Sequence, residues 1–558
     1  MRRPDSTVVI PAAVPVDTAI AADFGNISPI RLPTRGTSLG ARLWQTYRPL
    51  TSDIRFVLSS AEKEVVRAGG VFGLPTNVSI FSVERTLSLA DSILAAFSEE
   101  PSPSGRLIVN FGDTLIPRRV CGEDRVVVAK GQSLVRWTTL GRRTSGSWQV
   151  FEKHRVKPTE VTHWILAGVF EFRHSRTFLD GLRHANTTSS GTVDPFFVAL
   201  MRYLERSGPI DAEAVFEDQT NSWLDFGHID SLHTSRLAIG GASRSFNVVK
   251  VDATKGLVTK RSDRSREFAD ERQWYFSLGD SLRHIAPRVL SSESDKDLTL
   301  EYYGYPTLQD LYLYSSLDLG DWEIILNKLG DVLEQLGGAI QEPGVDPQAF
   351  AVDRSEMYFE KTLRRMNESF NDEGLRQAWQ LSRVNGVLCP TGAEIVQRLR
   401  GDLVAAGLLE PGRVGVIHGD FCLSNILFDR RSGVVRLIDP RGRFGSSVLH
   451  GDPLYDEAKL RHSFNGHYDF LVHELGSVSL GMVSAKLEVQ LSGLQIEIRE
   501  MFESWQQARL GDLAAAVRFV EALLFLSMVP LHADRPSAQI AFILRGRELY
   551  AQSIEVAE

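Results

Sequence analysis

Apolar and polar residues alternate in two different ways along this chain, and the first half has the pattern of layered strands and helices. Apolar runs such as "TVVIP", "IRFVLSS", "RLIVNF" and "WILAGVFEF" have the length of buried strands, and "ERTLSLADSILAAF" among them has helical spacing. Strands that alternate with helices are typical of an α/β domain. The pattern therefore predicts an α/β layer structure with a mainly parallel sheet in the N-terminal half.

A different pattern begins near residue 235. "RLAIGGASRSFNVVKVDATKGLVTKRS" holds three β-like runs, broken by a glycine pair and by the turn "DATKG", which predicts an antiparallel meander. From about residue 320 helices dominate, and "DWEIILNKLGDVLEQLGG" has the apolar stripe and the glycine end of an amphipathic helix. We therefore expect an N-terminal domain over 1–235, a strand-rich small lobe over 236–305 and a helix-rich large lobe over 306–558.

Composition adds a few limits to this picture. A chain of 558 residues is too long for one ordinary hydrophobic core, so at least two domains are expected. The formal net charge of −8 gives no electrostatic reason to expect nucleic acid as a partner. Three cysteines without a close pair favour a reducing cytoplasm. "LAAAVRFVEALLFLSMVP" is interrupted by Arg518 and Glu521, which indicates a buried helix and no membrane insertion.

One stretch, "VIHGDFCLSNILFDRRSGVVRLIDPRG" at 416–442, carries candidate chemistry. After Asn425 it reads as strand, tight turn and strand, so the hairpin returns Asp439 beside the loop that holds Asp420. Phosphoryl transfer needs a positioned hydroxyl and magnesium held against the phosphates. Asp420 would orient the hydroxyl and take its proton, while Asn425 and Asp439 would bind Mg²⁺. The alternative is a hydrogen-bonded turn that merely caps the hairpin.

"HGDFCLSN" followed by "LIDPRG" resembles the catalytic loop and metal-binding segment of aminoglycoside phosphotransferases and choline kinases. The resemblance covers roughly 236–558. It implies an α+β bilobal protein-kinase-like domain that uses ATP and Mg²⁺ on a small-molecule hydroxyl acceptor. Within the catalytic set, His418 is expected to hold the loop through hydrogen bonds. Asp452 and Asp456 are expected to be structural, and Arg441 is either a contact to a phosphate or acidic substrate or an ordinary surface arginine.

The same family places its nucleotide-binding residues upstream of the catalytic loop. By resemblance, Gly240 and Gly241 would form the nucleotide loop, Lys260 on the third strand would touch the phosphates, and Glu271 on the next helix would hold the lysine. Some positions compete with these. The alternatives are Lys250, Lys255 and Glu267.

"LTLEYYGYPTLQDL" resembles the segment that links the two lobes in this family. The resemblance implies that backbone groups from Glu301 to Tyr303 read the adenine edge. The alternative is an edge strand with surface tyrosines.

The first half resembles sugar-1-phosphate and choline-phosphate nucleotidyltransferases. "TVVIPAA", "IRLPTRGTSLGARLWQ", "TLSLADSILAAF" and "LIVNFGDTLI" are similar to successive elements of that family. The resemblance implies a Rossmann-like mixed sheet in which Asp113 and Asp225 bind magnesium between a nucleoside triphosphate and a sugar-type phosphate. Each aspartate alone could instead be a strand-end turn or a helix cap.

The loop after the first strand departs from that family. Members have glycines and an arginine there, because bare backbone N–H groups must approach the triphosphate. This chain reads "AAVPVDTAIAADFGN", with one late glycine and no equivalent arginine. Pro29 stands where a lysine is expected, and Arg31 lies two residues on. These changes indicate either altered nucleotide handling or lost catalysis.

Together these patterns predict an ATP- and Mg²⁺-dependent kinase for a hydroxyl of a sugar, polyol or amino alcohol. The fused nucleotidyltransferase-like domain would use CTP, UTP or GTP to convert the phosphoester into an activated building block for surface polysaccharide. The alternative is an N-terminal domain that only binds nucleotide or product, or forms a homo-oligomer.

Overall fold

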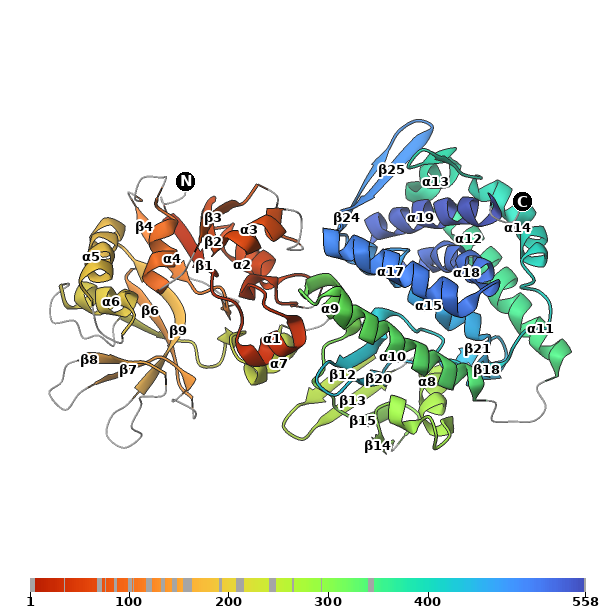
Figure 1. The fold of residues 1–558 in the computed structure, drawn as a ribbon, viewed down its shortest axis with the longest axis horizontal. Coiled ribbons are helices and arrows are strands. Elements are labelled where there is room, and N and C mark those ends of the chain that lie inside the picture. The colour runs from red at the N-terminus through yellow and green to blue at the C-terminus, as the bar shows by residue number, and fades with distance from the viewer. Residues whose placement is uncertain are drawn as a thin grey trace. The chain divides into compact units, whose positions relative to one another are not determined.

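The computed structural model divides the chain into two compact units, Met1–Gly241 and Ala242–Glu558 (Figure 1). The structure describes residues 6–34, 36–67, 73–75, 77–84, 88–98, 103, 105–116, 123–131, 136–142, 148–153, 163–189, 193–206, 215–239, 247–262, 265–292, 294–339 and 346–555. The helix α7 (Ile229–Ala238) crosses the boundary expected at residue 235.

The β-like run expected at the start of "RLAIGG" is wrong, because its first three residues form the last turn of α7. Leu232 and Ser235 of α7 are buried. The Ser235 hydroxyl donates to the Asp225 carbonyl at 2.7 Å. Packing against the N-terminal unit therefore keeps this segment helical.

Nine strands of the described residues form a mixed sheet in the N-terminal unit. They are Ser6–Pro11 (β1), Asp53–Ser59 (β2), Ser79–Val83 (β3), Arg106–Asn110 (β4), Arg125–Ala129 (β6), Thr139–Arg142 (β7), Trp148–Phe151 (β8), His163–Phe172 (β9) and Phe216–Asp218 (β10). The main order is β10-β6-β9-β4-β1-β2-β3. β1 is parallel to β2 and β4, but β9 is antiparallel to both β4 and β6. The Rossmann-like mixed sheet is confirmed, and the expectation of a mainly parallel sheet is wrong because β9 enters between β4 and β6 in the opposite direction.

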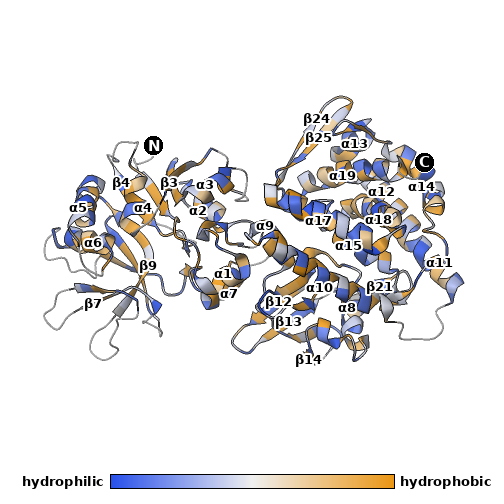
Figure 2. Ribbon diagram, viewed as in Figure 1, coloured by the Kyte–Doolittle hydropathy of each residue, from blue (hydrophilic) through white to orange (hydrophobic). Residues whose placement is uncertain are grey.

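The core of this unit lies where the apolar strands meet the helices. The helices are Thr18–Phe24 (α1), Leu39–Tyr47 (α2), Ser60–Val65 (α3), Leu89–Ala95 (α4), Ser175–Thr188 (α5) and Pro195–Arg206 (α6). β1 is buried along its whole length, and the central strands are coloured as hydrophobic in Figure 2. Ile93 of α4, Phe178 of α5 and Phe196 of α6 join the same buried cluster as Val9 and Val109 of the sheet. Burial of these strands on both faces explains their continuous apolar runs.

The C-terminal unit begins with an antiparallel sheet in the order β12-β13-β15-β14. These elements are Asn247–Asp252 (β12), Leu257–Ser262 (β13), Val289–Ser291 (β14), Asp297–Glu301 (β15) and the helix Ser265–Ser277 (α8). Gly256 closes the turn between β12 and β13 with a φ of +68°, a conformation that favours glycine. Of the predicted meander, the antiparallel pairing of the last two runs is confirmed as β12 and β13. Lys260 lies on the second described strand of this sheet and not on the third.

Helices dominate the rest of this unit, as expected. They are Leu308–Tyr314 (α9), Leu319–Gly338 (α10), Pro347–Ser355 (α11), Lys361–Phe370 (α12), Glu373–Gln380 (α13), Gly392–Ala405 (α14), Pro453–Phe464 (α15), Tyr468–Leu471 (α16), Gly493–Leu510 (α17), Leu513–Met528 (α18) and Pro536–Glu555 (α19). The predicted stripe of α10 is buried, including Trp322, Leu329 and Leu336. The segment Leu513–His532, which contains α18, is long and apolar enough to cross a membrane, but 72% of its most apolar window is buried inside the structure. This burial fits a core helix.

A hairpin positions the catalytic motif. The strand Ile426–Asp429 (β19) pairs antiparallel with Val434–Leu437 (β20), and Gly433 closes the turn with a φ of +67°. The Ile438 amide donates to the Asn425 carbonyl at 2.9 Å. The hairpin predicted from the sequence is therefore confirmed, and it brings the two ends of the motif together.

Candidate active site

The lysine and glutamate predicted in the small lobe meet in the structure. Lys260 on β13 places its Nζ 2.6 Å from Glu271 Oε1 on α8, and the same Nζ also contacts Asp439 Oδ1. The three side chains therefore join the small lobe to the segment after β20. Gly240 and Gly241, the expected nucleotide loop, lie outside the described residues.

The competing lysines and glutamate are placed differently. Lys250 and Glu267 are exposed, and Lys255 forms an ion pair of 3.2 Å with Asp252 in the turn. Burial opposes the charge of Lys260, but the carboxylates of Asp439 and Glu271 raise its pKa above the ordinary value. Lys260 therefore stays protonated, as a phosphate-binding side chain must.

Asp420 sits in a polar cage on the catalytic loop. The Asn425 side-chain amide donates to the Asp420 carbonyl at 2.9 Å and to its Oδ2 at 3.0 Å. Lys459 of α15 lies 2.8 Å from Asp420 Oδ1. Burial alone would raise the pKa of Asp420, but the charge and hydrogen bond of Lys459 outweigh it and lower the pKa to about 2. The sequence analysis missed Lys459, because no local motif connects this helix position to the loop.

His418 is fully buried and joins the loop to the end of β20. Its Nε2 lies 3.0 Å from the Ile438 carbonyl, and its Nδ1 accepts from the Asp420 amide at 3.3 Å. Burial lowers the pKa of His418 to about 4, so the imidazole is neutral at physiological pH. A neutral ring with both nitrogens engaged by the backbone suits the positioning role expected from the resemblance.

Asp456, one of the two aspartates expected to be structural, holds the backbone of the loop. It accepts from the His418 amide at 2.6 Å and from the Gly419 amide at 2.8 Å. Burial raises its pKa to about 7. Asp452 lies at the start of the same helix, where its Oδ2 accepts from Arg354 at 3.0 Å. Asp456 therefore anchors the loop at 418–419, whereas Asp452 ties the start of α15 to Arg354.

Asn425 and Asp439 fit a magnesium ion. The Asn425 amide nitrogen is used by Asp420, which leaves Oδ1 with one long hydrogen bond of 3.4 Å from Ser424. The Asp439 side chain is 53% exposed. Within the described ranges no group of three or more His, Cys, Asp or Glu side chains is close enough to hold a metal. Mg²⁺ commonly takes only one or two protein ligands and fills its shell with phosphate and water oxygens, so this pair suffices.

The segment between the lobes offers one backbone donor. The amides of Glu301 and Tyr302 donate to backbone carbonyls at 2.9 and 2.8 Å. The Tyr303 hydroxyl donates to Glu301 Oε2 at 2.9 Å. No hydrogen bond among the described residues uses the Tyr303 amide. That amide is therefore available for the adenine edge.

The N-terminal unit brings Asp113 and Asp225 together. The short strands Thr114–Leu115 (β5) and Leu224–Asp225 (β11) pair antiparallel. A Cβ added at Gly227 would lie 2.7 Å from Asp113 Oδ2 and 3.3 Å from Asp225 Oδ1. Both carboxylates therefore converge on the space that this glycine leaves open.

The charges at this pair favour a cation. Burial and then the charge of Asp225 raise the pKa of Asp113 to about 6, against a lowering effect of Lys153. His228 Nδ1 lies 3.1 Å from Asp225 Oδ2. Two close carboxylates that repel each other gain stability when a divalent cation binds, so the pair fits Mg²⁺. Lys153 and His228 were not singled out from the sequence.

The segment after β1 does not form an open loop of backbone donors. It contains the helix α1, and the Ala19 amide at its start donates to Asp17 Oδ1 at 2.9 Å. Arg31 is buried and lies 3.2 Å from Glu62. A carboxylate therefore caps the start of α1, and Arg31 already has an acidic partner.

Comparisons with known proteins give separate matches to parts of the chain. Residues 234–469 match the model of a phosphotransferase enzyme family. No curated protein is similar enough in sequence to match the chain.

Three solved structures are similar to parts of the chain, each at 14% identity. A candidate glucose-1-phosphate thymidylyltransferase from Bacillus anthracis covers 42% of this chain and 95% of its own, with a TM-score of 0.30. An inositol-1-phosphate CTP transferase from T. maritima covers 43% and 98%, with a TM-score of 0.30. A choline/ethanolamine kinase family protein from Mesorhizobium loti covers 59% and 95%, with a TM-score of 0.31. Residues 234–469, which match the phosphotransferase enzyme family model, contain the Lys260, Asp420 and Asp439 site described above.

Proposed function

We propose that the C-terminal unit is an ATP- and Mg²⁺-dependent kinase that phosphorylates a hydroxyl of a small metabolite, such as a sugar, polyol or amino alcohol. One observation carries the proposal: Lys260 contacts both Glu271 and Asp439, while Asn425 bonds to Asp420 and, through its carbonyl, to the segment that precedes Asp439. A phosphate-binding cation, two oxygen ligands and an acceptor-side carboxylate thus come from one connected set.

In this mechanism the small lobe binds the nucleotide. Lys260 binds the phosphates, and Glu271 holds the ammonium in place. The Tyr303 amide binds the adenine edge. Asn425 and Asp439 would hold Mg²⁺, which would supply charge neutralisation on the phosphates.

Asp420 acts on the acceptor. It orients the hydroxyl so that the acceptor oxygen bonds to the γ-phosphorus while the bond to the ADP oxygen breaks. The hydroxyl proton passes to Asp420 and then to solvent. A carboxylate with a pKa of about 2 is a weak base, so this transfer occurs late, when the new P–O bond has already made the proton acidic.

The test is mass spectrometry of a metabolite extract incubated with the full chain, ATP and Mg²⁺. Asp420→Ala is expected to lower phosphoryl transfer by about 10³-fold, because general-base and orienting groups contribute on this order. Asp429→Ala is the control, since Asp429 lies at the far end of β19 and bonds only within its turn. Equal transfer by the wild type and Asp420→Ala would contradict the proposed role.

We further propose that the N-terminal unit acts on the product of the kinase in the cytoplasm. A phosphoester oxygen would attack the α-phosphorus of CTP, UTP or GTP and release pyrophosphate, giving an activated building block for surface polysaccharide. The converging Asp113 and Asp225 favour this activity. The capped helix α1 favours the alternative, a module that binds nucleotide or product, or dimerises, without turnover.

A measurement of pyrophosphate release distinguishes nucleotidyl transfer from a binding module without turnover. Release that is lost in Asp113→Ala, while phosphoryl transfer stays intact, supports nucleotidyl transfer. Nucleotide binding with no pyrophosphate from any of the three triphosphates supports the binding module.

A further inference from the structure

Cationic side chains from separate segments of the chain lie around the phenol ring of Tyr455, near the loop that holds Asp420. The Tyr455 hydroxyl on α15 accepts from Lys361 Nζ at 3.3 Å and from Arg441 Nη1 at 3.1 Å. Lys361 lies on α12, and Arg365 follows it by one helical turn. Lys459 follows Tyr455 by one turn on α15. We call Lys361, Arg365, Arg441 and Lys459 the cationic cluster.

This cluster borders the candidate catalytic carboxylate. Lys459 Nζ lies 2.8 Å from Asp420 Oδ1. The Arg441 amide donates to the His418 carbonyl at 2.9 Å, and a Cβ added at Gly419 would lie 2.9 Å from Arg441 Cβ. Arg441 is thus packed against the residue that precedes Asp420. Any acceptor whose hydroxyl reaches Asp420 would have these cations close by.

Among the described residues three members of the cluster form no ion pair, and the carboxylates of Glu356 and Glu368 act on Lys361 and Arg365 only from a longer distance. Lys361 is only 4% exposed, and among the described residues its ammonium donates to the Tyr455 hydroxyl and to the Met357 sulfur, the latter at 3.9 Å. Arg365 donates to the Ser527 carbonyl at 3.2 Å. Within the described part of the chain, no carboxylate lies within 4.0 Å of the charged nitrogens of Lys361, Arg365 or Arg441. Burial and then the charges of Arg441, Arg365 and Lys459 lower the pKa of Lys361 well below its ordinary value.

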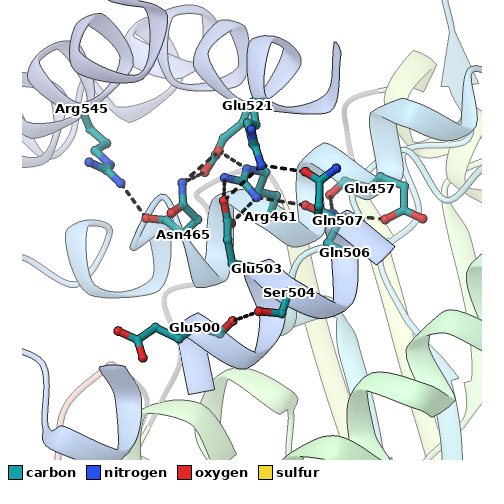
Figure 3. Close-up of polar contacts among 11 residues, drawn as sticks. Glu457, Arg461, Asn465, Glu500, Glu503, Ser504, Gln506, Gln507, Glu521 and Arg545 are labelled. Atoms are coloured by element: carbon teal, nitrogen blue, oxygen red, sulfur yellow. Dashed lines mark hydrogen bonds and ion pairs between the residues drawn. The ribbon is translucent and has the colours of Figure 1, made fainter. Parts of the chain in front are cut away.

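Three buried arginines of this unit have partners within the protein. Figure 3 shows Arg461, whose Nε donates to Glu521 at 2.7 Å and whose Nη2 donates to Glu503 at 2.9 Å. Arg354 pairs with Asp452, and Arg547 donates to backbone carbonyls, among them that of Pro390 at 3.0 Å. An unpaired buried charge is costly, and buried donors normally have partners. Lys361 differs from these arginines because it is buried without a carboxylate partner, and a bound anion would stabilise its charged form.

We propose that the cationic cluster binds an acidic group of the acceptor, so that the substrate carries a carboxylate, phosphonate or phosphate in addition to the hydroxyl that is phosphorylated. This inference rests on the proposed kinase function and narrows its substrate class. Guanidinium groups bind such oxyanions through paired hydrogen bonds. Lys459 holds Asp420 toward the hydroxyl, and Arg441, Arg365 and Lys361 face the acidic end. An acceptor with an ammonium group is disfavoured by the same charges.

The test uses a series of acceptors with one chain length: a hydroxyalkyl phosphonate, a hydroxyalkyl carboxylate, the neutral diol and the amino alcohol. Binding to the full chain is measured by calorimetry with Mg²⁺ and a non-hydrolysable ATP analogue present, so that the nucleotide site is filled. Phosphoryl transfer from ATP is measured on the same series. The two acidic compounds distinguish the kinds of acid that the cluster accepts.

Paired variants on one helix provide the control. Arg365→Gln is expected to weaken phosphonate binding by about tenfold, the loss typical of one charge-assisted hydrogen bond. Arg364→Gln is expected to leave it unchanged, because Arg364 is exposed and pairs with Glu356. Arg441→Gln and Lys361→Met should each weaken binding similarly, and melting curves establish that these variants are folded.

The outcomes separate this inference from the kinase function. Preferential transfer to an acidic acceptor that Arg365→Gln weakens supports both. Transfer to the diol or the amino alcohol at equal or higher rate overturns the acidic acceptor and leaves the kinase intact. Cluster-dependent phosphonate binding without transfer to any compound supports the anion site and counts against the kinase. Phosphonate binding that is absent, or equal in Arg364→Gln and Arg365→Gln, overturns the inference.

Discussion

The two units of this protein both bring carboxylates together at strand ends, but they neutralise them differently. In the C-terminal unit each carboxylate has a cation or amide partner, and the pKa of Asp420 falls to about 2. In the N-terminal unit Asp113 faces Asp225, and its pKa rises to about 6. The first site is thus electrostatically satisfied by the protein, whereas the second gains most from an added cation.

The segments that we propose contact a nucleotide also differ between the two units. Here the C-terminal unit presents a cation and the N-terminal unit a carboxylate. The C-terminal unit offers Lys260, whose ammonium is held by Glu271 and which we propose binds phosphate. The N-terminal unit places the carboxylate of Asp17 at the start of α1, where it accepts from the Ala19 amide. The carboxylate pair Asp113 and Asp225 and the cap at Asp17 can therefore vary independently, because they lie on different segments.

The largest effect that we expect is on the free energy of unfolding, and it comes from the buried His418 of the C-terminal unit. Its pKa is 6.5 in the unfolded chain and about 4 in the folded one, so the folded unit binds fewer protons between these values. Its contribution to stability is present above pH 6.5 and is lost as the pH falls toward 4, by about 3 kcal/mol over the full window. The measurement is the free energy of unfolding of the C-terminal unit against pH, in wild type and His418→Gln.

The variant is needed because Asp456 acts in the opposite sense. Its folded pKa of about 7 means that acidification favours the folded state. The difference between wild type and His418→Gln isolates the histidine. A difference that does not change between pH 7 and 4 would show that the buried imidazole is not neutral.

The next effect tests the nucleotide side of the C-terminal unit. Glu271→Gln is expected to lower kcat/KM for ATP by about thirtyfold, since a charge-assisted contact to Lys260 is lost. Glu267→Gln, on the exposed part of the same helix, is the matched control. Steady-state kinetics with varied ATP give both values. Equal losses in the two variants would remove the case for the Lys260–Glu271 pair.

The smallest effect that we expect is on nucleoside triphosphate binding by the N-terminal unit. It tests whether the carboxylate at the start of α1 opposes this binding. Asp17→Ser keeps a capping oxygen but removes a negative charge from the start of α1, so nucleoside triphosphate binding should strengthen about threefold to fivefold. Calorimetry with CTP, UTP and GTP, on a background of Asp420→Ala and Lys260→Met to silence the kinase site, measures this. Weaker binding in Asp17→Ser would mean that the cap organises the nucleotide site instead of opposing it.

The sequence correctly predicted those parts of the fold that depend on local pattern. The buried stripe of α10 and the hairpin of β19 and β20 follow from spacing and from a glycine turn. The run at 236–239 could not be assigned this way, because a short apolar run fits a strand or the end of a helix, and contacts of Ser235 with Asp225 decided for the helix. The direction of β9 was also beyond local pattern, since an antiparallel central strand is as apolar as a parallel one.

For the site, the sequence alone determined the residues within one motif, because a loop and a hairpin necessarily bring Asp420, Asn425 and Asp439 near one another. Only the tertiary structure decided which lysine and glutamate pair across the small lobe, and that Lys459 holds Asp420. It also decided that Lys361 and Arg441 share one phenol. Such contacts join helices and loops that lie far apart in the chain, and their geometry is set by how apolar faces pack and not by the spacing of polar residues.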